Sequence, residues 1–179
     1  DLYDEQKMKE LQMIKSVYEG AGYKTIKISA VERTNLEKIK DLMKNKISLI
    51  AGQSGVGKSA ILNAIDSKLN LRTENISKSH KTGKHTTTYA EMHFLSFGGS
   101  VIDTPGIKGF GLVDFEKEEI YHFFPEIFKA SKDCEYHNCS HTHEINCAVK
   151  NSVEKGVISE TRYRNYLRIL EDKGMKYRG

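Results

Sequence analysis

The sequence has few cysteines, no long apolar run and no signal-peptide pattern. Its longest aliphatic stretch, Ile47 to Ala51, is far shorter than the roughly 20 residues of a membrane-spanning helix. The first ten residues, DLYDEQKMKE, lack the basic start and the apolar segment of a secretion signal. We therefore expect a cytoplasmic protein that does not associate with membranes.

The three cysteines fall within 14 residues, between positions 134 and 147, and histidines lie among them. An odd number of cysteines grouped in this way favours a metal site over a disulfide framework and is typical of a reducing compartment. Three thiolates and one imidazole suit a tetrahedral structural zinc ion. Cys134, Cys139 and Cys147 supply the sulfurs, and three histidines compete for the fourth position: His137, His141 and His143.

Charge is distributed unevenly along a chain of ordinary composition, which is 38% hydrophobic and 29% charged. The net charge is +4, and residues 155–179 hold seven basic residues against three acids. Such a segment can bind phosphate or nucleic acid, or it can simply be a solvated surface, and charge alone does not separate the two. The seven are Lys155, Arg162, Arg164, Arg168, Lys173, Lys176 and Arg178.

The order of secondary-structure patterns predicts an α/β domain followed by a helical one. Apolar strands at 47–50, 88–97 and 100–103 alternate with a helix at 58–69, which is typical of a mostly parallel sheet covered on both faces. Gly98-Gly99 predicts a tight hairpin between the last two strands. The later helices, expected at 115–130, 148–155 and 160–173, place the domains at 1–111 and 112–179.

The amino-terminal part predicts a helix, a strand and a second helix. Met8 to Tyr18 carries apolar residues at helical spacing, and 23–28 alternates as a short strand does. Thr34 and Glu37 match a capping box at the start of the next helix.

A complete phosphate-loop motif, G-x-x-x-x-G-K-S, lies between an apolar strand and a helix. Its glycines allow backbone N–H groups to surround phosphate oxygens at the helix N-terminus. Lys58 is expected to reach the β- and γ-phosphates, and the Ser59 hydroxyl to bind Mg²⁺. The predicted nucleotide contacts are Gly52, Gln53, Ser54, Gly55, Val56, Gly57, Lys58, Ser59 and Ala60.

The segment Asp103-Thr-Pro-Gly106 follows a hydrophobic strand, 44 residues after Ser59. Asp103 is therefore predicted to bind Mg²⁺, directly or through water, and the Gly106 N–H to contact the γ-phosphate. Between these motifs, a threonine of the segment GKHTTT is expected to complete the Mg²⁺ shell. Thr87 is the preferred residue and Thr86 the next.

The amino-terminal pair Asp1-Leu2 and the later pair Ser29-Ala30 resemble the two guanine-binding segments of G proteins. They precede the phosphate loop, whereas in an ordinary G protein they follow it, so this order indicates a circular permutation. Together with GQSGVGKS, GKHTTT, DTPG and the Cys/His cluster, the order closely resembles the RsgA (YjeQ) family over essentially all 179 residues.

The resemblance implies a circularly permuted P-loop GTPase of Ras-like, three-layer α/β/α fold, followed by a zinc-binding helical domain. It implies a GTPase that binds the small ribosomal subunit and its 16S rRNA, not DNA, in late maturation, and that leaves on hydrolysis. The subunit would stimulate hydrolysis. It also implies Asp1, Ser29 and Ala30 at the guanine, His141 as the fourth zinc ligand, and an OB-fold domain outside these residues. We expect a monomer with GTP or GDP, Mg²⁺ and one Zn²⁺.

Ile107 occupies the position where Ras-like enzymes carry a water-orienting glutamine, and it cannot form a hydrogen bond. Our hypothesis is that His85 orients the water once a partner orders its loop; an exposed histidine without a catalytic role is equally consistent with the sequence. The alternative function is a nucleotide-gated rRNA-binding module with negligible intrinsic hydrolysis. A P-loop ATPase or kinase is a third possibility.

Overall fold

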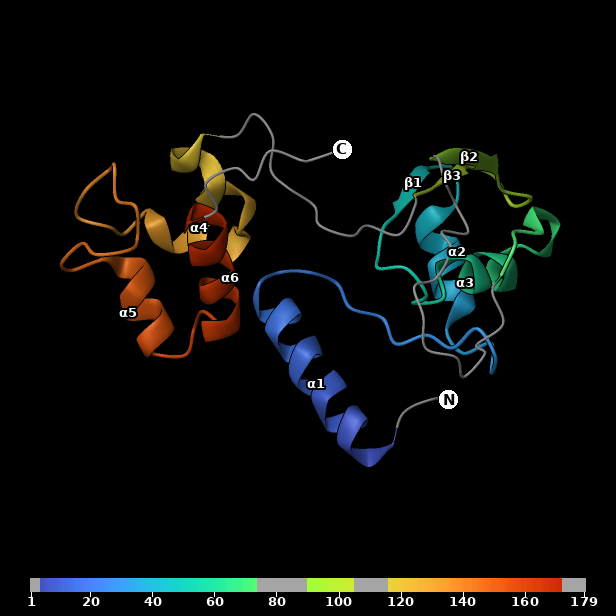
Figure 1. Ribbon diagram of the computed structural model, residues 1–179, viewed down its shortest axis with the longest axis horizontal. Helices are drawn as coiled ribbons and strands as arrows, with labels where there is room; N and C mark the ends of the chain where they lie inside the picture. Colours follow the sequence, from blue (N-terminus) through green and yellow to red (C-terminus); the bar gives the residue numbers. More distant parts are fainter. Residues whose placement is uncertain (1–3, 74–89, 105–115, 172–179) are drawn as a thin grey trace. The chain divides into compact units, whose positions relative to one another are not determined.

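The computed structural model describes residues 4–73, 90–104 and 116–171 (Figure 1). They divide into two compact units. The first contains the described residues of Ile26–Phe110, and the second those of Leu2–Thr25 and Gly111–Gly179. The predicted first domain, 1–111, also included residues 4–25, which the structure groups with the second unit. As functional domains, 1–111 and 112–179 stay a prediction. No helix of the described part has the length and apolar character to cross a bilayer.

The first unit is a three-stranded sheet with helices on one of its faces (Figure 1). Strand β3 is central: it pairs in parallel with β1 and antiparallel with β2. Leu62 and Val101, which have no solvent-exposed surface, mark the centre of the core that joins α3 to the sheet. In chain order the elements are α2 (Leu36–Met43), β1 (Ile47–Ile50), α3 (Lys58–Ile65), the 3₁₀ helix η1 (Ser67–Leu69), β2 (Glu91–Phe94) and β3 (Ser100–Asp103).

The predicted hairpin between β2 and β3 is confirmed. Gly98 and Gly99 both have φ of 93°, a conformation that side chains with a Cβ rarely adopt. The Leu95 N–H donates to the Gly99 carbonyl at 3.0 Å, which closes the turn. The Asp66 carboxylate accepts from the Ser96 N–H at 2.6 Å and so ties the end of α3 to this hairpin.

Two predictions for the amino-terminal part were wrong. Residues 23–28 form no strand, because no partner strand lies beside them among the described segments. The capping box does not form either: α2 begins after Asn35, whose left-handed φ of 55° gives no side-chain cap. The backbone of Thr34 instead pairs with that of Ser29 across a tight turn.

The second unit consists of helices around a core that includes two of the three cysteines. Cys139 and Cys147 lie in this core with Ile127, Val149 and Tyr166. The elements are α1 (Glu5–Gly20), the 3₁₀ helix η2 (Lys117–Phe123), α4 (Pro125–Ser131), α5 (Ala148–Glu154) and α6 (Glu160–Glu171).

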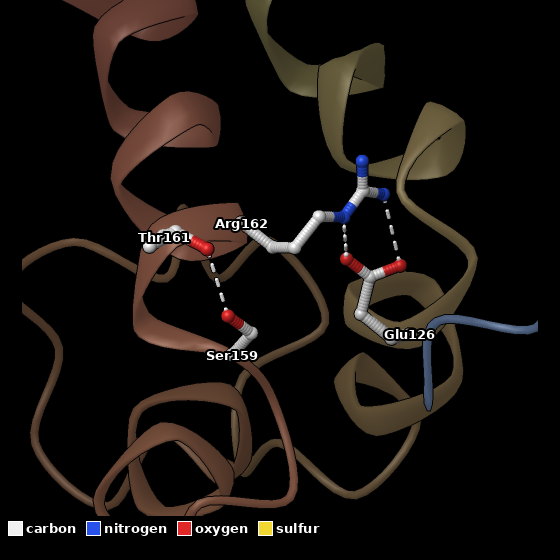
Figure 2. Close-up of polar contacts among 4 residues, drawn as sticks. All are labelled: Glu126, Ser159, Thr161 and Arg162. Carbon is white, nitrogen blue, oxygen red and sulfur yellow. Dashed lines mark hydrogen bonds and ion pairs between the residues drawn. The ribbon is translucent and has the colours of Figure 1, made fainter. Parts of the chain in front are cut away.

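An ion pair joins α4 to the first turn of α6 (Figure 2). Arg162 donates from Nε to Glu126 Oε1 at 2.6 Å and from Nη2 to Oε2 at 3.1 Å. The guanidinium lies 4.8 Å from the centre of the Phe124 ring, and the rings of Tyr18 and Tyr23 also face it. Arg162 therefore connects the α1 segment to the rest of this unit and is not a free basic group for a ligand.

Candidate functional site

The phosphate-loop motif forms the turn between β1 and α3, as its pattern predicts. Gly55 and Gly57 have φ of 79° and 94°, and Gly57 is the N-cap residue of α3. Only glycine adopts this left-handed conformation without strain, and it lets the chain curl before the helix begins. The first N–H groups of α3 have no partner within the helix, so they are available to an anion.

Lys58 is held against this loop. Its ammonium donates to the Gly52 carbonyl at 2.9 Å and to the Gln53 carbonyl at 3.1 Å. The Lys58 stem packs beside Gly52: a Cβ added there would lie 3.7 Å from Lys58 Cδ, an ordinary contact, and 3.3 Å from Val56 Cγ2, a tight one. The loop backbone thus positions a cation at the start of α3, where phosphate oxygens would bind.

The strand register brings Asp103 next to the phosphate loop. Ile50, the last residue of β1, pairs with Asp103, the last residue of β3, and the two strands are parallel. The Thr104 hydroxyl donates to the Ile50 carbonyl at 2.8 Å, which fixes these two strand ends together. Asp103 is only 3% exposed. A carboxylate at this edge, one strand from the phosphate loop that leads to Ser59 in the first turn of α3, suits a hydrated Mg²⁺ ion.

The predicted guanine-binding pair Ser29-Ala30 lies in a tight turn before α2. The Ser29 hydroxyl accepts from the Glu32 N–H at 3.0 Å, and Arg33 donates to the Ala64 carbonyl of α3 at 3.3 Å. These contacts anchor the turn to the first unit. Within the described residues, no hydrogen bond joins Ser29 or Ala30 to the phosphate loop, so their role at the base stays a prediction.

Five predicted site residues lie outside the described part of the chain. They are Asp1 at the base, His85, Thr86 and Thr87 in the threonine segment, and Gly106 after Asp103. Their roles stay predictions from the sequence.

The four predicted zinc ligands converge in the second unit. The ligand atoms of Cys134, Cys139, His141 and Cys147 all lie within 4.8 Å of one another. His141 Nδ1 is 3.6 Å from the sulfurs of both Cys134 and Cys147, which are 3.9 Å apart. The rival histidines, His137 and His143, are exposed and are not part of this cluster.

These separations fit a tetrahedral zinc site. Bonds of about 2.3 Å to sulfur and about 2.0 Å to nitrogen place two sulfurs about 3.8 Å apart and a sulfur about 3.5 Å from the nitrogen. The separations of 3.9 Å and 3.6 Å among Cys134, His141 and Cys147 agree with both values.

Burial shifts the protonation of the cluster toward neutral forms. It raises the pKa of Cys139 to about 12 and that of Cys147 above its usual range, and it lowers the pKa of His141. A neutral imidazole is ready to bind a metal, whereas the thiols must lose their protons to do so. Metal binding should therefore release protons.

Glu144 organises the ligand loop, a role that sequence reasoning missed. It accepts from the Ser140 N–H and hydroxyl, both at 2.6 Å, and from the Thr142 N–H at 2.9 Å. Burial alone would raise the pKa of Glu144, but the hydrogen bonds from Ser140 and Thr142 outweigh it and lower the pKa to about 2. Serine and threonine close before an acid, inside a Cys/His cluster, are the sequence signal for this arrangement.

Two tyrosine hydroxyls of α6 also contact the ligand loop. Tyr166 lies in the core of the second unit and Tyr163 packs against it. Their hydroxyls donate to the carbonyls of His141 and Ser140. A buried stripe that uses tyrosine where phenylalanine would pack equally well is the signal for such bonds.

Comparison with known proteins gives consistent matches over the whole chain. The family model described as RsgA GTPase matches residues 1–113. Small ribosomal subunit biogenesis GTPase RsgA from Flavobacterium psychrophilum is 49% identical over 178 residues, which is 99% of this chain and 55% of the relative. RsgA 2 from Bacteroides thetaiotaomicron is 50% identical over 173 residues, 97% of this chain and 56% of the relative. The chain thus spans about half the length of the curated relatives it matches.

Two solved structures share the fold. YjeQ from Thermotoga maritima has a TM-score of 0.79 and 39% identity, over 95% of this chain and 55% of that protein. YloQ, described as a circularly permuted GTPase, has a TM-score of 0.73 and 31% identity, over 94% of this chain and 52% of that protein. The predicted fold class, a circularly permuted P-loop GTPase followed by a helical unit with a Cys/His cluster compatible with zinc, is confirmed.

Proposed function

Because this chain belongs to the RsgA GTPase family, we propose that it binds GTP and hydrolyses it while bound to the small ribosomal subunit. Hydrolysis would then release it from the subunit late in maturation. The relatives' names refer to the biogenesis of this subunit, and they supply the partner class. We further propose that the protein contacts the 16S rRNA of the subunit and binds neither DNA nor a membrane. It would act as a monomer in the cytoplasm.

The observation that carries the nucleotide site is the pairing of Ile50 with Asp103. It places the phosphate loop and a buried carboxylate at the carboxyl edge of two adjacent parallel strands, where ligands bind in open α/β sheets. Lys58 and the loop N–H groups would hold the β- and γ-phosphates of GTP or GDP. Ser59 and Asp103, with Thr87 or Thr86, would hold Mg²⁺, which neutralises charge on the phosphates.

For hydrolysis we propose Gly106 as an N–H donor to the γ-phosphate and His85 as the group that orients the attacking water. The support is the position of both residues in the sequence, together with the apolar Ile107 after Gly106. We also propose that the guanine base is bound by Asp1, Ser29 and Ala30, again from their positions in the sequence. The circular permutation would place them before the phosphate loop in the chain.

The Cys/His cluster would bind one structural zinc ion. Four protein ligands leave no open coordination position for a substrate, so the ion would stabilise the second unit and take no part in the chemistry. Its binding free energy at neutral pH is on the order of 10 kcal/mol, comparable to the entire stability of a small domain. Reduced thiolates also agree with a cytoplasmic location.

The direct test measures phosphate release from GTP with and without purified small ribosomal subunits. We expect slow turnover that the subunits raise at least tenfold, and loss of GTP binding in Lys58→Ala. Lys38→Ala, which removes an exposed lysine of α2, is the matched control and should behave as wild type. An excess of ATP should not displace GTP. Subunit binding that depends on GTP without any phosphate release would instead support the rRNA-binding module.

A further inference from the structure

We infer that Tyr163 and Tyr166 position His141 as a metal ligand, so that α6 sets the metal affinity of the cluster. The inference rests on the proposed zinc site. It assigns a role to two side chains that do not themselves bind the ion.

The backbone of His141 needs external support. Its φ is 58°, in the left-handed region that residues with a Cβ seldom occupy. Such a conformation persists only where surrounding contacts hold it in place. His141 is 1% exposed, so protein groups and not solvent must provide these contacts.

Two hydroxyls from one face of α6 provide this support. Tyr163 donates to the His141 carbonyl at 2.6 Å, and Tyr166 donates to the Ser140 carbonyl at 2.8 Å. Residues three apart lie on the same side of a helix, so the pair grips two consecutive carbonyls of the ligand loop.

The imidazole lacks the support that usually orients a metal-binding histidine. Such a ring normally donates its second N–H to a carboxylate, a carbonyl or water, which fixes its orientation. Here Nδ1 faces the sulfurs of Cys134 and Cys147, while Nε2 is buried and has no hydrogen-bond partner within the described residues. The Tyr121 ring packs edge-on against the imidazole, with the two ring centroids 5.1 Å apart, and limits the space in which the imidazole can rotate. The hydrogen bonds from the Tyr163 and Tyr166 hydroxyls to the loop carbonyls therefore take over the role of orienting His141.

The inference predicts a loss of metal affinity from the removal of either hydroxyl. In Tyr163→Phe or Tyr166→Phe the ring still fills its place, but one loop carbonyl is released and His141 can turn away from the sulfurs. Outer-shell partners of this kind change metal affinity by about 10- to 100-fold. We expect about a tenfold loss for each variant.

Cobalt titration of the metal-free protein is the test, because Co²⁺ bound by thiolates and imidazole gives visible absorption that reports its ligands. Tyr163→Phe and Tyr166→Phe should bind Co²⁺ about tenfold more weakly than wild type. Their spectra should shift toward that of His141→Ala, which keeps the three thiolates. Tyr121→Phe is the matched control: its ring packs against the same imidazole, but its hydroxyl donates no hydrogen bond within the described residues, so this variant should stay within about twofold of wild type.

Two outcomes would overturn the inference. One is wild-type affinity and spectrum in both α6 variants, even if urea unfolds them more easily, since that would make the hydroxyls purely structural. The other is an equal loss in all three tyrosine variants, which would indicate general packing. If wild type itself gave no thiolate–cobalt absorption, the proposed metal centre would fail and the inference with it, and this result is distinct from the other two.

Discussion

The ion pair between Glu126 and Arg162 should be among the most sensitive polar contacts of the second unit. Both side chains are largely buried, at 7% and 12% exposed. Glu126→Ala would leave the guanidinium among aromatic rings without its counter-charge. Breaking a buried pair on one side costs about 3–5 kcal/mol. Because Arg162 keeps some contact with solvent, we expect the lower end of this range, about 3 kcal/mol.

The pair formed by Glu160 and Arg164 offers an internal control. It is exposed, at 66% and 67%, and Glu160 lies in the first turn of α6 as Glu126 does in α4. Both substitutions to alanine therefore remove a favourable charge from a helix N-terminus. Only Glu126→Ala also removes a buried partner. Glu160→Ala should cost about 1 kcal/mol or less, the sum of an exposed i,i+4 pair and a charge at the helix N-terminus.

Hydrogen–deuterium exchange of the metal-loaded protein is the suitable assay, because it reports the opening free energy of each segment separately. Peptides from α4 and α6 should exchange faster in Glu126→Ala by about two orders of magnitude, which corresponds to about 3 kcal/mol. Peptides from α3, in the first unit, should be unchanged. A cost below about 1 kcal/mol, or one equal to that of Glu160→Ala, would refute the reasoning.

Three further predictions concern the hairpin, acid stability and the metal. Gly99→Ala should destabilise the first unit by several kcal/mol, because the added Cβ would lie 2.6 Å from the Lys46 carbonyl oxygen; thermal unfolding would show a clear drop in midpoint, whereas Gly20→Ala, with open space around it, should show none. Burial alone would raise the pKa of Asp66, but hydrogen bonds from Ser96 and Lys68 outweigh it and lower the pKa. Wild type should therefore have a higher free energy of unfolding than Asp66→Asn, with the full difference above about pH 4 and a smaller difference as the pH falls further. Urea titrations across this pH range measure the difference, and one that stays constant down to about pH 2.5 would contradict the prediction. Chelation should speed exchange in α4–α6 before α3, and simultaneous loss of both units would contradict separable stabilities.

Local patterns predicted much of the fold because they act over a few residues. The phosphate loop, its flanking strand and helix and the Gly98-Gly99 hairpin each depend on neighbours in the chain, and each was found where the sequence placed it. The strand expected at 23–28 was wrong because a strand depends on a partner from elsewhere. The capping box at Thr34 was wrong because the backbone of that residue pairs with Ser29 instead.

The distribution of charge also could not be interpreted from neighbouring residues alone. Counted along the sequence, Arg162 belongs to the basic carboxyl-terminal segment, for which charge alone left a phosphate or nucleic-acid site and a solvated surface equally open. In the fold it is buried against Glu126, which lies 36 residues earlier. Charge counts along the chain do not reveal which charges are neutralised by distant partners.

The sequence by itself determined the identity of the groups: the glycines and Lys58 of the loop, Asp103, and the three thiols with an imidazole. These follow from residue type and spacing. Only the tertiary structure decided that Ile50 and Asp103 share a register and that the hydroxyls of Tyr163 and Tyr166 contact the ligand loop. Residue spacing alone left His137, His141 and His143 open, the family resemblance favoured His141, and the structure places His141 in the cluster. The reason is physical: the strand register and the tyrosine contacts join residues far apart in the chain, and the orientation of His141 within its loop arises only when the core packs around it.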